Sequence, residues 1–413
     1  MTNTFQKNGR LLIYAPVSVY GVHEGWLVDK QAANGLRLWA ENFDHVTVMM
    51  PHQDGPPPTG WVPAENIGPN LTRVSIVPLP TAWVFPRFAK VYRKTRDTIR
   101  QEIEGADYLS FAIGGLVGDW GAVACLQAHA MGRRFAVWTD RVESEVVRVE
   151  SFSGAGSLKN RIKKRVIHRP MAMLERFVIK RATIGLFHGQ QTYDAYAPFC
   201  KKPNIVHDIH VKRDAHITDE VFNAKIASAK SDPLHIVYAG RVTAMKGPLH
   251  WASALQKLSA AGFDFEAHWL GDGPMLAELR AQLEADGLMD RVTLHGFVED
   301  PAQVTARLQA AHIFLFCHTT PESPRCLIES LIAGTPIIGY DGSYAADLIS
   351  NFGGGHLVPI DDLDALGTCL IHLATDRDQL VALNKSARED GKPFDDESVF
   401  VHRSMVIKRF LGR

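Results

Sequence analysis

The chain has 413 residues, of which 46% are hydrophobic. This length exceeds what a single hydrophobic core supports and fits two domains. The 45 basic and 45 acidic residues balance, so bulk charge gives no indication of nucleic-acid binding, and no nucleic-acid partner is expected. The five cysteines are widely spaced and form no CxxC pair, which is typical of a reduced cytosolic chain without structural zinc.

Neither the start of the chain nor its interior predicts a leader or a membrane span. Residues 1–21 contain no long apolar region and no small-residue cleavage site, so we expect no signal peptide. The longest apolar region, 108–132, is interrupted by Asp119 and by glycines. No segment offers the roughly 20 apolar residues that cross a bilayer. We expect a cytoplasmic protein, and contact with the inner face of a membrane stays open.

Short apolar runs alternate with amphipathic stretches along the chain. The helical pattern is clear at 274–287 (PMLAELRAQLEADG) and 301–311 (PAQVTARLQAA). Buried strands separated by amphipathic helices indicate α/β units with parallel sheets. The polar, weakly patterned segment 204–233 is interpreted as the connection between two Rossmann-like halves. The predicted strands are 11–16, 45–51, 134–140, 183–189, 234–240, 265–271, 291–297, 311–318 and 335–340.

Several predicted strands end in polar residues, and ligands of open α/β sheets bind beyond the carboxyl ends of the strands. His23 and Glu24 follow the first strand after a loop, and His318 ends a strand of the second half. Asp140 and His188 each end an apolar strand of the first half. Either fits a general base or a ligand for a sugar hydroxyl. The alternative for each is a structural role, in which the side chain only forms hydrogen bonds within the protein.

The stretch YAGRVTAMKG (238–247) follows a predicted strand and opens a helix. Gly240 ends the strand, Arg241 lies at the turn and Lys246 comes just before the helical pattern. Two cations with free backbone N–H groups at a helix start predict a diphosphate site. The spacing is not that of the phosphate-binding loop GxxxxGK[ST].

The stretch TPESPRCLIESLIAGTP (320–336) predicts a helix start. Ser323 fits the N-cap and Pro324 the first helical position. Glu322 would then precede the helix and Glu329 would lie in its second turn. The N–H groups of Arg325, Cys326 and Leu327 would be free to meet an anion. The alternative is that Glu322 and Ser323 only cap the helix and that Glu329 is a surface residue.

Two acidic or glycine-rich motifs have structural interpretations. GDGP (271–274) lacks the third glycine of a dinucleotide fingerprint and favours a tight strand–helix turn. DDLD (361–364) contains a DxD but precedes a helical pattern, which favours helix capping. The eighteen histidines show no metal-ligand spacing, so no metal is expected.

Residues 151–174 contain six Lys or Arg and no Asp or Glu, with Leu158, Ile162 and Val166 recurring every four residues. A basic amphipathic helix of this kind fits an anionic membrane surface. The alternative is a solvated helix whose apolar side faces the core.

With these residues in place, the second half resembles the retaining glycosyltransferases of glycosyltransferase family 4. The first half matches only in architecture, through an early strand and the loop YGVHEG, which contains Gly21. The resemblance implies the GT-B fold, an α/β class with two Rossmann-like domains that face each other across a cleft. These would be 1–212 and 213–390, with 391–413 as a closing helix that packs back on the first domain. The matching stretches, in that family's order, are YAGRVTAMKG, HWLGDGPMLAELR, VTLHGFV and PESPRCLIESLIAGTPIIGYDGS.

The resemblance also implies a role for each site residue. Arg241 and Lys246 would be catalytic, since they would hold the donor diphosphate and stabilise the leaving phosphate. Glu322 and Asp140 are also expected to be catalytic, Glu322 through hydroxyls of the donor sugar and Asp140 on the acceptor side. Glu329 would bind the nucleotide ribose. The other donor-binding positions would be Gly21, His188, Gly240, Ser323, Arg325, Cys326 and Leu327.

The implied reaction is retaining sugar transfer from a nucleotide diphosphate sugar to a glycan or lipid-linked acceptor, in cell-surface polysaccharide biosynthesis, without cofactor or metal. The chain departs from the family pattern in three places. Its early loop, VYGVHEG, contains fewer glycines than is usual in the family. Glu322 and Glu329 are seven residues apart where the family usually has eight, and Asp140 stands where a histidine is often found. The alternatives are a GT-B sugar-nucleotide epimerase and a non-catalytic nucleotide-sugar-binding subunit of a polysaccharide assembly complex.

Overall fold

The computed structural model describes residues 9–22, 25–58, 60–64, 71–151, 158–231, 233–319 and 324–412. The chain forms two compact units, which are described separately. Unit 1 comprises Met1–His210 and Asp396–Arg413, and unit 2 comprises Val211–Asp395. The expected boundaries, 212/213 and 390/391, lie within a few residues of these. No helix in the described ranges is long and apolar enough to cross a membrane.

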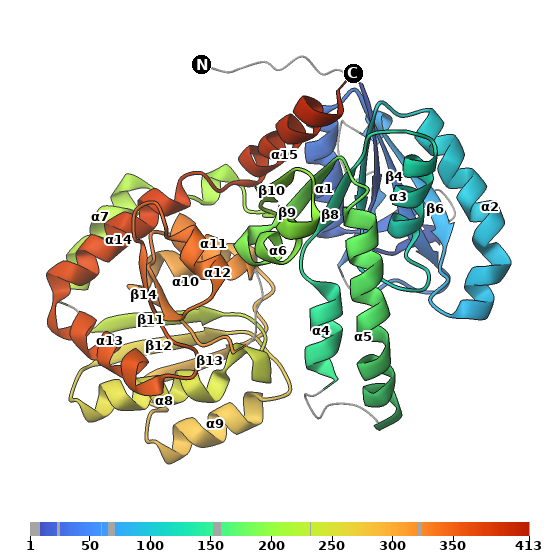
Figure 1. Cartoon of the computed structure of the whole chain (residues 1–413). Helices are drawn as coiled ribbons and strands as arrows, with labels where there is room; N and C mark the ends of the chain where they lie inside the picture. Colours follow the sequence, from blue (N-terminus) through green and yellow to red (C-terminus); the bar gives the residue numbers. More distant parts are fainter. Residues whose placement is uncertain are drawn as a thin grey trace. The chain divides into compact units, whose positions relative to one another are not determined.

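Unit 1 is built on a mainly parallel sheet covered by helices (Figure 1). The pairs β2–β3 and β3–β5 are antiparallel, and the other described pairs are parallel. In sheet order the strands are β10 (Pro203–Val206), β9 (Ile184–His188), β8 (Ala136–Thr139), β7 (Tyr108–Ala112), β1 (Arg10–Tyr14), β4 (His45–Gln53), β2 (Val19–Val22), β3 (Gly25–Asp29) and β5 (Trp61–Pro63), and β6 (Val74–Pro80) also pairs with β4. The helices are α1 (Lys30–Asn42), α2 (Phe85–Glu104), α3 (Trp120–Ala130), α4 (Glu143–Glu150), α5 (Leu158–Ile179), α6 (Gly189–Tyr196) and α15 (Asp396–Leu411).

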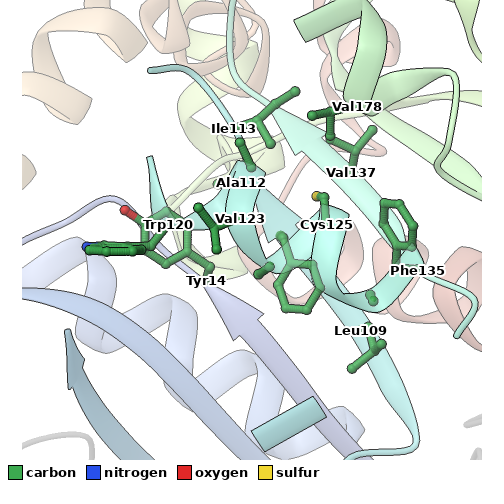
Figure 2. Packing of buried hydrophobic residues seen from close by; sticks show 14 of the residues in the cluster. Tyr14, Leu109, Ala112, Ile113, Trp120, Val123, Cys125, Phe135, Val137 and Val178 are labelled. Atoms are coloured by element: carbon green, nitrogen blue, oxygen red, sulfur yellow. The ribbon is translucent and has the colours of Figure 1, made fainter. Parts of the chain in front are cut away.

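The core of unit 1 lies between the sheet and helices α3 and α5. Leu109 of β7, Val137 of β8, Cys125 of α3 and Val178 of α5 are all buried in one cluster (Figure 2). The apolar region 108–132 is therefore a strand and a helix of this core. Asp119, which interrupts that region, caps α3 by accepting N–H bonds from the backbone of its own turn.

Unit 2 is a parallel sheet in the strand order of the dinucleotide-binding fold. In sheet order its strands are β13 (Val292–Gly296), β12 (Phe265–Leu270), β11 (Leu234–Ala239), β14 (Ile313–Phe316), β15 (Ile337–Tyr340) and β16 (Gly355–Val358). The helices are α7 (Asp219–Ser231), α8 (Pro248–Ala260), α9 (Leu276–Ala285), α10 (Pro301–Ala310), α11 (Arg325–Ile332), α12 (Ser343–Leu348), α13 (Leu363–Thr375) and α14 (Arg377–Gly391). The chain runs outward in opposite directions from β11 and β14, so a ligand-binding crevice is expected between their carboxyl ends.

The structure confirms all nine predicted strands and the helical patterns at 274–287 and 301–311. The chain passes from unit 1 to unit 2 within 204–233, as interpreted, but the segment is not only a connection, because it also contains most of β10 and the whole of α7. The sequence pattern did not predict α7, because one of the buried positions on its apolar face is occupied by a lysine, Lys225. Its Nζ donates to the Ala333 carbonyl at 2.7 Å and to the Thr335 hydroxyl at 2.5 Å, which satisfies the amine inside the protein.

Candidate functional site

The carboxyl ends of β11, β12 and β14 meet in unit 2. The N–H of Gly240, just after β11, donates to the Leu270 carbonyl at the end of β12 at 2.9 Å. Val242 N–H donates in turn to the Asp272 carbonyl at 3.0 Å. GDGP (271–274) therefore forms the tight turn that was predicted, and it supports the turn that carries Arg241.

Arg241 and Lys246 lie on one short turn between β11 and α8. Arg241 is exposed and Lys246, the last residue of a 3₁₀ turn (Ala244–Lys246), is half-buried. Lys246 N–H donates to the Thr243 carbonyl at 2.9 Å, and Gly247 N–H donates to the Ala244 carbonyl at 3.0 Å. The amides of Lys246 and Gly247 are therefore not among the free N–H groups expected at the helix start, because the tight turn uses them internally. The side chains of Arg241 and Lys246 give this turn two positive charges.

Gly247 fixes where α8 begins. Its backbone is left-handed, with φ 61° and ψ 46°, and Pro248 follows as the first helical residue. A Cβ on Gly247 would lie 2.1 Å from the Cys317 carbonyl oxygen, so only glycine allows the turn to approach β14 this closely. This contact holds Lys246 beside the end of β14.

The segment after β14 is bonded to the same turn. Thr319 N–H donates to the Met245 carbonyl at 3.1 Å, and His318 Nε2 lies 2.7 Å from the hydroxyl of Tyr238 in β11. The chain that leads from β14 toward residue 320 therefore starts next to Lys246. Glu322 and Ser323 lie outside the described residues.

Helix α11 begins at Arg325, one residue later than predicted. Pro324 is the N-cap, with an extended ψ of 129°, and not the first helical residue. The N–H of Leu327 donates to the Pro324 carbonyl at 3.2 Å. The prediction that the Leu327 amide is free for an anion is therefore wrong, because the first turn of the helix closes on Pro324.

Glu329 lies in the second turn of α11, as predicted. The residue is half-buried, and burial raises the pKa of its carboxyl group, against the opposing positive charge of Arg325. A carboxyl group that is withdrawn from water favours hydrogen bonds to neutral hydroxyls. This environment is compatible with a ribose ligand and differs from that of a freely solvated surface residue.

Asp140 and His188 lie at strand ends of unit 1, as predicted. Asp140 follows β8 and its carbonyl accepts a bond from the Thr192 hydroxyl at 3.4 Å. His188, buried at the end of β9, accepts the Asp208 N–H on Nδ1 at 3.0 Å. A neutral His188 ring therefore carries its proton on Nε2, as a donor.

Two residues at this strand end were missed by the sequence analysis. Asp208 and Arg403 are both buried, and Arg403 Nη1 donates to Asp208 Oδ1 at 3.0 Å. Asp208 lies in the segment that was interpreted as a connection, where HDIH (207–210) was the available signal. Arg403 comes from α15, which no local pattern links to β10.

Gly21 lies within a strand, and not in a loop as expected. It belongs to β2 and pairs with Trp26 of β3 in an antiparallel hairpin. His23 and Glu24, between these strands, lie outside the described residues.

The DDLD motif caps a helix, as predicted. Asp362 accepts the Ala365 N–H at 2.9 Å at the start of α13, and Asp364 pairs with Lys257 at 2.6 Å. Within the described ranges, no group of three or more His, Cys, Asp or Glu is arranged to hold a metal ion.

Comparison with protein families gives a match to "Glycosyl transferases group 1" over residues 220–390. The group 1 segment contains the turn with Arg241 and Lys246 and the whole of α11. It confirms the predicted relationship at the level of group 1.

Curated relatives of the chain are named glycosyltransferases. The amylovoran biosynthesis glycosyltransferase AmsK of Erwinia amylovora is 30% identical over 178 residues, which are 42% of this chain and 44% of that protein. The 2-deoxystreptamine glucosyltransferase of Streptomyces kanamyceticus is 32% identical over 105 residues, or 25% and 27% of the two chains. The chain thus spans less than half the length of either relative.

Solved structures confirm the fold class, α/β of the GT-B type with two Rossmann-like units. Anabaena Alr3699/HepE in complex with UDP has a TM-score of 0.66 at 14% identity, over 97% of this chain and all of that chain. WaaG, a glycosyltransferase involved in lipopolysaccharide biosynthesis, has a TM-score of 0.61 at 14% identity, over 96% and 99% of the two chains. At this identity the similarity shows the fold.

Proposed function

We propose that this protein is a retaining glycosyltransferase that moves a sugar from a nucleotide diphosphate sugar to a glycan or lipid-linked acceptor. The observation that carries the proposal is the turn after β11. It presents Arg241 and Lys246 beside the end of β14, at the point where the strand order of unit 2 reverses. A strand-end crevice with two cations suits a diphosphate.

The proposed site for the nucleotide-sugar donor combines this turn with α11. Arg241 and Lys246 would bind the diphosphate, with Gly240, Arg325 and Cys326 lining its site, and Glu329 would bind the ribose. Glu322 and Ser323 are proposed to approach the donor sugar from the segment before α11. HepE was solved with UDP and with UDP-glucose, which supports a uridine donor for this chain.

The chemistry proposed is a same-face displacement. The bond between the sugar's anomeric carbon and the diphosphate oxygen breaks, and the acceptor oxygen forms its bond on the face that the diphosphate leaves. The acceptor's proton passes to the leaving diphosphate, whose growing negative charge Arg241 and Lys246 stabilise. Because these cations supply the positive charge, no metal or other cofactor is proposed, and chelation with EDTA should leave the transfer rate unchanged.

The acceptor is assigned to unit 1. Asp140 would contact its hydroxyl groups. Gly21 and His188 would lie on the side of the nucleotide sugar, with His188 as a hydrogen-bond donor through Nε2. The name of AmsK, an amylovoran biosynthesis enzyme, supports a role in cell-surface polysaccharide biosynthesis. A lipid-linked acceptor would place the protein at the inner face of an anionic membrane.

A thermal-shift screen of nucleotide sugars tests the donor assignment. A ligand at a hundred times its Kd stabilises the folded state by about 2.7 kcal/mol, so one uridine or other nucleotide sugar should raise the unfolding temperature. The best donor is then incubated with and without glycan acceptors. Conversion of the donor without any acceptor would favour the epimerase alternative. Binding without transfer to any acceptor would favour the non-catalytic subunit.

A further inference from the structure

The start of α2 presents an exposed apolar tip. Trp83, Val84 and Phe85 are consecutive and are 59%, 59% and 69% exposed, whereas the preceding Ala82 is 1% exposed. Three adjacent large apolar side chains in water are unfavourable unless a partner covers them. We refer to Trp83–Phe85 as the α2 tip.

The backbone of the α2 tip is held in place. Trp120 Nε1 donates to the Pro80 carbonyl at 2.8 Å, and a Cβ on Gly118 would lie 2.5 Å from the Ala82 carbonyl oxygen. Phe88, one turn into α2, packs its ring 5.1 Å from that of Trp120. The tip therefore projects from a fixed backbone.

Only cations surround the tip along the first half of α2. Arg87, Lys90, Arg93 and Lys94 are all exposed, and the first acidic residue of the helix is Asp97. The described ion pairs within α2 join Arg96 to Asp97 and Arg100 to Glu104, in its second half. The apolar tip is thus followed by a positively charged first half of α2.

Helix α5 presents a second exposed apolar face on the same unit. Ile162, Val166 and Met173 are 54%, 67% and 71% exposed. At about 100° per residue they lie within a sector of about 40°, opposite the buried Met171 and Val178. The expectation that the apolar side of this helix could face the core is therefore wrong for Ile162 and Val166.

The charged residues that α5 itself presents on this side are also positive. Arg165 and Arg169 are exposed on the same side of α5. The acidic residue of α5, Glu175, points inward and accepts bonds from the backbone N–H and hydroxyl of Ser144 at 3.0 and 2.6 Å. Phe177 is excluded from the face, because the Arg181 guanidinium lies over its ring at 3.3 Å.

Both faces lie toward one edge of unit 1. Helix α2 starts after the carboxyl end of β6, and α5 leads back to the amino end of β9. Their first turns therefore lie on the side of the carboxyl ends of the strands, as Asp140 and His188 do. Helix α3 lies between α2 and α5 and contacts both, and α4 and α5 project beyond this edge of the sheet (Figure 1).

We propose that the α2 tip and the Ile162–Val166 face of α5 together form a docking surface for an anionic lipid bilayer. Exposed aromatic and aliphatic side chains enter the interface while flanking Lys and Arg meet lipid phosphates, a combination that binds membranes more firmly than either signal alone. The inference rests on the proposed function only in that a lipid-linked acceptor would reach Asp140 from this edge.

Co-sedimentation of the full chain with vesicles tests the surface. Vesicles of phosphatidylglycerol and phosphatidylcholine in equal parts should bind the protein, with binding that weakens as salt rises, and phosphatidylcholine alone should bind it far less. The paired change Trp83→Ser with Phe85→Ser should lower the binding constant by about tenfold or more, and so should Ile162→Ser with Val166→Ser. Charge reversal at Arg87 and Lys90 should do the same.

Matched controls lie in unit 2. Phe352→Ser removes a side chain that is 56% exposed, and Arg280→Glu reverses an exposed cation; both should bind vesicles as the wild type does. Equal binding to neutral and anionic vesicles, or unchanged binding by the Trp83 and Phe85 variant, would overturn the proposal. Sedimentation velocity provides a further test. A wild-type dimer that becomes a monomer in the Trp83 and Phe85 variant would also overturn the proposal, since a second copy of the chain would then cover the α2 tip.

Donor binding separates this inference from the proposed function. The variants of the α2 tip and of α5, which are designed to lose vesicle binding, should keep the wild-type thermal shift with nucleotide sugars. This shift would show that they fold. If no nucleotide sugar shifts the protein but vesicles still bind it, the proposed function fails and the docking surface stands. If a nucleotide sugar raises the unfolding temperature but vesicles do not bind the protein, the docking surface fails and the proposed function stands.

Discussion

Nη1 of Arg403 donates to Oδ1 of Asp208 at 3.0 Å, although 195 residues separate them in the sequence. The guanidinium also lies over the rings of Trp39, Trp138 and Phe400 at 4.9 to 5.0 Å. Burial lowers the pKa of Arg403, and the nearby carboxylate of Asp208 opposes that shift. This one side chain joins the last helix of the chain to the strand end where His188 is oriented.

Replacing Arg403 by alanine should destabilise unit 1 by about 3–5 kcal/mol, because the Asp208 carboxylate would stay buried without its partner. Urea unfolding followed by circular dichroism measures the loss. Arg409→Ala removes an exposed arginine of the same helix and should cost no more than about 0.5 kcal/mol. Equal losses of unfolding free energy in the two variants would show that the buried Arg403–Asp208 pair adds no more stability than an exposed arginine does.

Arg241→Ala and Lys246→Ala should abolish sugar transfer while the fold survives. Each removes a charge that opposes the leaving diphosphate, so we expect kcat/KM to fall by about a hundredfold or more. Initial rates with the donor from the thermal-shift screen measure the effect. Arg280→Ala, an exposed arginine on α9, is the control and should retain the wild-type rate. Full activity in both site variants would disprove the site assignment.

Gly247→Ala should unfold the turn that carries Lys246. Its Cβ would meet the Cys317 carbonyl oxygen at 2.1 Å, whereas a Cβ on Gly287, with a similar φ of 67° against 61°, meets nothing within 4 Å. Gly287→Ala should therefore cost only the left-handed strain of about 1–2 kcal/mol. Gly247→Ala should cost several times more and lose the donor-induced thermal shift. Similar unfolding midpoints for the two variants would contradict the close approach to β14.

The stability of unit 2 should fall on acidification. Burial, then the nearby charges of His235 and Lys225, lowers the pKa of His312 from 6.5 to about 3. Below pH 6.5 the unfolded chain binds a proton that the folded protein excludes, so this contribution is present above 6.5 and is lost as pH falls toward 3. At about pH 5 the loss from this group is about 2 kcal/mol.

His312→Gln tests this pH dependence, because it removes the titration and can keep a hydrogen bond to Ser228, whose hydroxyl lies 2.8 Å from the ring Nε2. The readout is the slope of unfolding free energy against pH, so a lower overall stability of the variant does not obscure the result. An unchanged slope between about pH 5 and 7 would show that His312 does not titrate as expected.

The sequence by itself determined the fold class and the main elements of both units. Buried parallel strands are continuous apolar runs, so the nine predicted strands could be read from the composition of short windows. The order of motifs in the second half also indicated Arg241, Lys246 and Glu329 as members of one site. These are local signals, since each depends on residues within a few turns of chain.

Only the tertiary structure decided what surrounds those residues. It showed that the turn uses the amides of Lys246 and Gly247, that Leu327 bonds to Pro324, and that Arg403 reaches Asp208. It also showed Ile162 to be exposed where periodicity allowed a core position. Hydrogen-bond partners and burial depend on contacts between segments distant in sequence, and no window of neighbouring residues contains that information.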